Sequence, residues 1–85
     1  MQIYYSSKFE REYKKFPKSI KELAEEKEKL FRGNSFHPSL NTHKLSGRLK
    51  EYWAFSLNNK HRIIFEFAEE DIVWFHSIGD HSIYG

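Results

Sequence analysis

The 85-residue chain has no cysteine, which excludes a disulfide framework and a thiolate metal site and fits a reducing compartment. It has only two prolines and four glycines, so long disordered or linker segments are not expected. No apolar run approaches the length of a membrane span, and the first residues lack the basic and apolar regions of an export signal. We therefore expect one soluble domain over residues 1–85, cytoplasmic and with no membrane partner.

Aromatic residues are what the chain has in quantity: eight Phe, five Tyr and two Trp. Each ring buries a large apolar area, which is how a chain this short can fill a hydrophobic core.

Charge is distributed unevenly, although the formal net charge is only +2. Residues 31–62 hold six Lys or Arg against the single acid Glu51, a net of +5, whereas residues 63–85 hold five acids and no Lys or Arg, a net of −5. A basic block of this kind suits a polyanion such as a nucleic acid, because each neutralised phosphate releases counterions. Solvated loops and strand ends would give the same pattern, so both readings remain open at this point.

The first half of the chain predicts a short strand and two helices. Residues 3–5 read as a strand, and Ser6 or Ser7 can cap the helix that follows. Phe9, Tyr13 and Phe16 share one helical face. A second amphipathic helix starts near residue 17 and ends at residues 33–34, followed by a polar loop to residue 43.

The second half changes to a period of two, which predicts three strands over residues 48–57, 61–67 and 72–78. A two-residue turn is expected at Asn58-Asn59, since Asn tolerates positive φ. Side chains expected to face the helices are Leu49, Trp53, Phe55, Leu57, Ile63, Phe65 and Phe67. Side chains expected on the opposite face are Lys50, Tyr52, Ala54, Ser56, Arg62, Ile64 and Glu66. The fold class is therefore α+β: a short N-terminal strand and a two-helix hairpin packed on one face of a mostly antiparallel four-stranded sheet.

The uncovered face of this sheet is a candidate binding surface. Lys50 and Arg62 offer cations for phosphates and Tyr52 offers a ring for a base, the combination that binds single-stranded RNA. A groove for a partner protein would look similar, and the pattern alone does not decide between them.

Two histidines stand at the ends of predicted strands, where side chains can converge. His43 lies just before the first long strand and His81 just after the last. Histidine gives and takes protons near neutrality, which suits RNA cleavage by attack of the 2′-OH, a reaction that needs a base and an acid but no metal. Each histidine taken alone also fits a solvated loop. His76 reads as a packed or edge residue, and no pair has the close helical spacing of a zinc site.

Four stretches carry a family resemblance. They are the opening Tyr5-Ser6-x-x-Phe9, the segment from His43 to Trp53, the strand His61-Arg62-Ile63-Ile64-Phe65, and the ending Ile78-Gly79-Asp80-His81-Ser82-Ile83-Tyr84. In this order they resemble the toxins of the RelE, YoeB and YafQ group over nearly the whole chain.

The resemblance implies a toxin of a type II toxin–antitoxin system that cuts mRNA, with the ribosomal A site as the place of cleavage and a cognate antitoxin as partner. It implies no metal and no cofactor. His81 matches the acid, Arg62 the arginine that stabilises the transition-state phosphate, and His43 a position that can supply the base. Further substrate-binding residues are expected at Arg48, Lys50, Lys60 and Tyr84.

Two departures from the family pattern bear on the strength of catalysis. Many members have Arg at or just after the position of Trp53, and some have a second His where Ser56 stands. Two alternatives therefore remain: a ParE-like toxin that poisons DNA gyrase, and a catalytically weak relative that acts as an antitoxin-binding module. ParE-type relatives generally lack the terminal histidine, so the combination of His43, Arg62 and His81 favours the nuclease.

Overall fold

The computed structural model describes residues 1–80 of the chain. Its elements are β1 (Gln2–Tyr5), α1 (Ser7–Lys14), α2 (Lys18–Gly33), β2 (His43–Lys44), β3 (Trp53–Ser56), β4 (Arg62–Glu69) and β5 (Ile72–Gly79), with short 3₁₀ helices at Pro38–Leu40 and Gly47–Leu49. Neither α-helix within residues 1–80 is long and apolar enough to cross a membrane.

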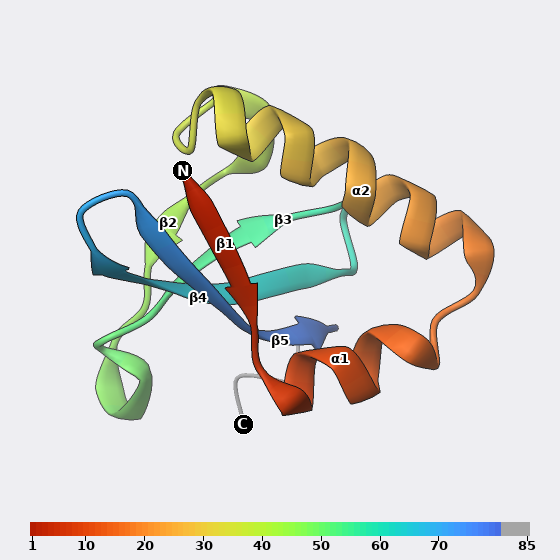
Figure 1. The fold of residues 1–85 in the computed structure, drawn as a ribbon. Coiled ribbons are helices and arrows are strands. Elements are labelled where there is room, and N and C mark those ends of the chain that lie inside the picture. Colours follow the sequence, from red (N-terminus) through yellow and green to blue (C-terminus); the bar gives the residue numbers. More distant parts are fainter. Residues whose placement is uncertain (81–85) are drawn as a thin grey trace.

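The strands form one five-stranded sheet in the order β1-β5-β4-β3-β2 (Figure 1). β1 runs parallel to β5, and all the other pairs are antiparallel. The predicted fold class, two helices on one face of a mostly antiparallel sheet, is confirmed. The sheet has five strands where four were expected, because residues 43–44, assigned to the end of a loop, pair with Trp53 and Ala54 as β2.

Both helices begin where the sequence predicts. The Ser6 side chain is the N-cap of α1 and accepts a hydrogen bond from the backbone N–H of Phe9 (3.0 Å), and Pro17 immediately precedes α2. The Ser6 hydroxyl also donates to the carbonyl of His76 (2.9 Å), which ties the start of α1 to β5.

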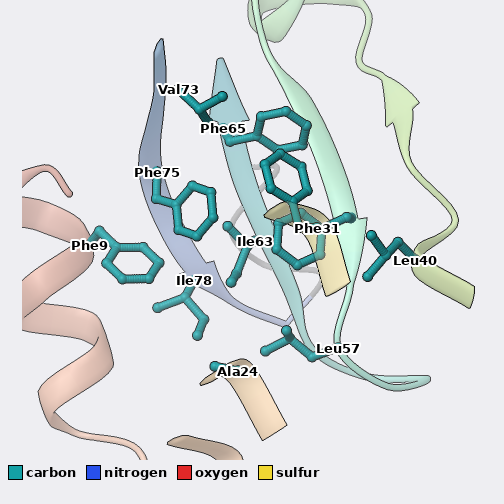
Figure 2. Close-up of a cluster of buried hydrophobic side chains, with 11 residues drawn as sticks. Phe9, Ala24, Phe31, Leu40, Leu57, Ile63, Phe65, Val73, Phe75 and Ile78 are labelled. Carbon is teal, nitrogen blue, oxygen red and sulfur yellow. The ribbon is translucent and has the colours of Figure 1, made fainter. Parts of the chain in front are cut away.

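The core lies between the helices and the sheet and is built largely of phenylalanine (Figure 2). Phe31 of α2 is fully buried, with its ring centroid 4.9 Å from those of Phe55 and Phe65 and 5.7 Å from that of Phe75. The buried cluster comprises Phe9, Ala24, Phe31, Leu40, Phe55, Leu57, Ile63, Phe65, Val73, Phe75 and Ile78. Ring-to-ring contacts between a helix and three neighbouring strands thus fix how α2 sits on the sheet.

The predicted strand over residues 48–57 is wrong in its first half. Residues 47–49 form a 3₁₀ helix followed by a turn, and β3 covers only residues 53–56. Gly47 has a left-handed backbone (φ 67°), and the carbonyl of Leu49 accepts the N–H of Tyr52 at 2.9 Å. These local bonds compete with the extended chain, so Leu49 stays out of the buried cluster and Lys50 is not on a strand face.

The expected two-residue turn at Asn58-Asn59 is also wrong. β3 ends at Ser56 and β4 begins at Arg62, and neither asparagine has positive φ. Instead, the side-chain oxygen of Asn58 accepts the backbone N–H groups of Lys60 (2.8 Å) and His61 (2.7 Å). A side-chain acceptor therefore organises a longer loop in place of a tight turn.

Candidate active site

The face of the sheet turned away from the helices brings His43 and Arg62 together. Directly paired residues on neighbouring strands point to the same face. His43 pairs with Ala54, which pairs with Ile64 on β4, two residues from Arg62. Ala54 and Ile64 are buried, yet neither belongs to the cluster beneath the helices. This open face is therefore the surface that carries both predicted residues, as the alternation of the strands indicated for Arg62.

The separation of the two residues suits a phosphodiester between them. β3 lies between β2 and β4, and the pairs His43–Ala54 and Ser56–Arg62 are two residues apart along β3. Strands about 4.8 Å apart with a rise of about 3.3 Å per residue place the Cα atoms of His43 and Arg62 roughly 12 Å from each other. Two long side chains starting from those positions can contact one small group from different sides.

His43 is oriented as a base requires. It is exposed, and its Nδ1 atom lies 2.9 Å from the carbonyl oxygen of Asn41. Since a carbonyl oxygen only accepts hydrogen bonds, Nδ1 carries the proton, and Nε2 is the nitrogen that can receive one. Asn41 adopts the left-handed conformation (φ 49°) that Asn tolerates, and this turn directs its carbonyl toward the histidine ring.

Arg62 begins β4, in the interior of the sheet. It is half-buried and is paired on one side with Ser56 and on the other with Gly79. The preceding residue, His61, has its ring edge-on against Phe16 at 5.4 Å, on the helix side of the sheet. His61 and Arg62 thus point to opposite faces of the sheet.

The open face also holds a histidine whose position the sequence did not reveal. His76, expected to be a packed or edge residue, is half-buried and packs with its ring 4.7 Å from that of Tyr52, and its Nε2 lies 2.9 Å from the Glu66 carboxylate. The register explains this, because Phe65 pairs with Phe75 and Ile64 with Ser77, so that His76 is the extra residue of a β-bulge. An outward-facing Glu66 in the middle of a strand was the one sequence signal for a partner of this kind.

A pair of stacked aromatic rings extends the open face. Tyr4 of β1 and Trp74 of β5 are paired neighbours with ring centroids 5.1 Å apart and planes at 28°, and they are 43% and 36% exposed. The acidic turn at residues 69–71 lies at this end of the strands, whereas Arg62 lies at the other. Arg62 and the acids of residues 69–71 thus lie at opposite ends of the strands.

The remaining predicted site residues lie at both ends of the strands. Arg48 and Lys50 are exposed in and after the 3₁₀ helix at residues 47–49, which leads into β3 at Trp53, at the end opposite to Arg62, whereas Lys60 is exposed in the loop that leads to Arg62. His81 and Tyr84 lie outside the residues that the structure describes. Within residues 1–80, no group of three or more His, Asp or Glu side chains is arranged to hold a metal ion.

A family model matches this chain over residues 1–84, and it is the model of the YafQ toxin, a bacterial toxin of a type II toxin–antitoxin system. A comparison with curated protein sequences gives no significant match.

Solved structures share the fold at low sequence identity. YafQ from E. coli strain BL21(DE3) superposes with a TM-score of 0.82 and 17% identity over 98% of this chain and 96% of that one. YafQ in the E. coli DinJ–YafQ toxin–antitoxin complex gives 0.78 and 19% identity over 96% and 93%. The YoeB–YefM complex from Staphylococcus aureus gives 0.78 and 21% identity over 95% and 97%. The likeness covers nearly the whole of each chain.

Proposed function

Because this chain belongs to the YafQ family of bacterial type II toxins, we propose that it is a metal-independent endoribonuclease that cleaves mRNA on the ribosome. The observation that supports this proposal most strongly is that Arg62 and His43 lie on the same open face of the sheet, with Nε2 of His43 left to accept a proton. Attack by a 2′-OH requires a base that takes the hydroxyl proton and a cation that stabilises the negative charge on the phosphate.

The reaction follows from these roles. Nε2 of His43 takes the proton of the 2′-OH, the 2′-oxygen forms a bond to phosphorus, and the bond from phosphorus to the 5′-oxygen breaks. His81 gives a proton to the departing 5′-oxygen. The Arg62 guanidinium stabilises the extra negative charge on the pentacovalent phosphorus, because a fixed cation acts most strongly where charge develops.

Further basic and aromatic residues hold the RNA. Arg48, Lys50 and Lys60 supply cations for flanking phosphates, and Tyr84 supplies a ring against the nucleotide. His76 contacts Tyr52 and donates its Nε2 hydrogen to Glu66, which leaves Nδ1 as an acceptor on the same face.

The partner that neutralises the protein is a cognate antitoxin. DinJ with YafQ and YefM with YoeB were solved as complexes of this kind. An acidic antitoxin segment suits residues 31–62, whose net charge is +5. The protein then acts in the cytoplasm, where its mRNA substrate is translated.

The test is induced expression in cells without the antitoxin, with primer extension on a reporter mRNA. The wild type is expected to arrest growth and to give discrete new 5′ ends, and Arg62→Ala is expected to give neither. Arg11→Ala is the matched control, because it removes the same charge from α1 on the helix side of the molecule.

Two other results would overturn the proposal. Intact mRNA with double-strand breaks and an induced DNA-damage response would identify a gyrase poison. Normal growth with folded protein and no antitoxin would identify a binding module without activity.

A further inference from the structure

The last four residues of β5, residues 76–79, have no neighbouring strand on the side of β1. β1 pairs with β5 only as far as Tyr5 and Phe75, after which the chain turns into α1. Backbone groups of residues 76–79 on that side therefore have no strand to bond. A buried N–H without an acceptor costs about 1–3 kcal/mol, so another group must replace the strand.

Side chains from α1 and its N-cap residue replace the missing strand as hydrogen-bond partners. The Ser6 hydroxyl donates to the carbonyl of His76 at 2.9 Å. Farther along, Oε1 of Glu12 accepts the backbone N–H of Ile78 at 3.1 Å and the hydroxyl of Ser77 at 2.8 Å. Ser77 and Ile78 are only 3% and 1% exposed, so water does not offer an alternative acceptor. One carboxylate thus accepts two hydrogen bonds from this strand end, and Ile78 lies 66 residues away from Glu12 in the sequence.

The strand end that Glu12 holds is the one that the proposed chemistry uses. Gly79 pairs with Arg62, and Asp80 leads directly to His81 in the sequence. A shift of this segment would change the direction from which the Arg62 cation approaches the phosphodiester.

We propose that Glu12 is a positioning residue of the active site, which acts through the end of β5 on the geometry of Arg62. This inference rests on the proposed ribonuclease function. Glu12 does not contact the RNA. It contributes by keeping the segment from Ser77 to Asp80 in one place, and a displacement of about 1 Å at a reacting group can cost about 100-fold in rate.

The kinetic test compares kcat and KM for cleavage by four full-length proteins. Glu12→Ala is expected to lower kcat about 10- to 100-fold and to leave KM within about twofold, because binding groups remain in place. Glu12→Gln keeps an oxygen that can accept both hydrogen bonds and is expected to restore kcat to within about threefold of the wild type. Glu10→Ala removes an exposed carboxylate from the same helix and is expected to match the wild type.

Three outcomes would overturn the inference: an unchanged kcat in Glu12→Ala, an amide variant as slow as the alanine variant, or a loss of kcat no greater than the loss of folded protein. Should Glu12→Ala fail to fold, Ser77→Ala removes one of the two donors and leaves the carboxylate on Ile78. It is expected to lower kcat in the same sense by a smaller factor.

Amide hydrogen exchange separates this inference from the proposed function. Glu12→Ala is expected to speed exchange at the Ile78 amide at least about tenfold, while the amide of Phe65 in the core strand keeps its protection. Unchanged protection at Ile78 would show that Glu12 does not hold the strand end, whatever the protein does to RNA. If Glu12→Ala loses protection at Ile78 while the wild type cuts no RNA, the strand-end contact stands and its catalytic role is overturned.

Discussion

His43 illustrates how a single hydrogen bond selects a chemical role. Its contact with the carbonyl of Asn41 fixes which nitrogen holds the proton. By contrast, Nδ1 of His37 lies 3.1 Å from the backbone N–H of Ser39 and therefore accepts. The two histidines look alike in the sequence and differ in the structure, which supports His43 rather than His37 as the proposed base.

Replacement of His43 tests that role. His43→Ala is expected to lower the single-turnover rate of RNA cleavage by about 10² to 10⁴, the usual range for loss of a general base. His37→Ala is the matched control and is expected to cleave at the wild-type rate, because its ring serves only to cap a 3₁₀ helix. A rate for His43→Ala within a few-fold of the wild type would assign the base to another group.

Residue positions were predictable where side-chain alternation held. Arg62 and Ile64 follow the simple alternation of β4, and both lie on the expected face. His76 does not, because a bulge inserts one residue and shifts the register between β4 and β5. A bulge depends on tertiary packing and leaves no period in the sequence, so the contact of His76 with Glu66 could be found only in the structure.

At the scale of elements, a tyrosine joins the first strand to the second helix. The hydroxyl of Tyr5 donates to the Glu28 carboxylate, with oxygen distances of 2.8 and 2.9 Å. Burial, together with the hydrogen bond to Glu28 and its negative charge, raises the pKa of Tyr5 from 10.0 to about 12, although the nearby Arg32 acts in the opposite sense.

This contact gives stability a dependence on alkaline pH. The folded pKa lies above the unfolded one, so the contribution of Tyr5 is complete below pH 10.0 and is lost as pH rises toward about 12. The free energy of unfolding of the wild type, measured relative to Tyr5→Phe, should be constant up to pH 10.0 and then fall. The comparison cancels other groups that titrate in this range, and a difference that stayed constant up to pH 12 would contradict the assignment.

The conformation of the loop between β3 and β4 depends on the side chain of Asn58 and not on that of Asn59. Asn58→Ala leaves the N–H groups of Lys60 and His61 without their acceptor, and we expect a loss of about 1–2 kcal/mol in the free energy of unfolding. Asn59→Ala, one residue away, should change it by less than about 0.5 kcal/mol. Chemical denaturation of both variants measures the difference. Equal losses would mean that the asparagine side chain does not organise the loop.

The elements that could be predicted are those long enough for the apolar spacing of a helix or a strand to repeat several times. α2 has sixteen residues and β4 has eight, and both were found from apolar spacing. β2 has two residues, too few to show a period, and exists only because β3 pairs with it. The apolar alternation already begins in residues 47–52, before the true start of β3. Gly47, with its positive φ, turns the backbone there and prevents an extended strand.

At the scale of the whole molecule, the layers separate stability from chemistry. Helices and core phenylalanines occupy one side of the sheet (Figures 1 and 2). His43, Arg62 and His76 occupy the other. Along the sheet, Lys60 and Arg62 lie at one end of the strands, and the acids of residues 69–71 lie at the other.

The chemical nature of the RNA ends produced is the most direct test of this account. The purified protein would be incubated with translating ribosomes, and also with RNA alone in the presence of a chelator, and the cleaved ends analysed. Attack by the 2′-OH predicts a 2′,3′-cyclic phosphate on one fragment and a 5′-hydroxyl on the other, with chelation leaving cleavage of RNA unaffected. Fragments with a 5′-phosphate and a 3′-hydroxyl, or cleavage that requires a divalent metal, would contradict the proposal that His43 and Arg62 direct the 2′-OH at the phosphate.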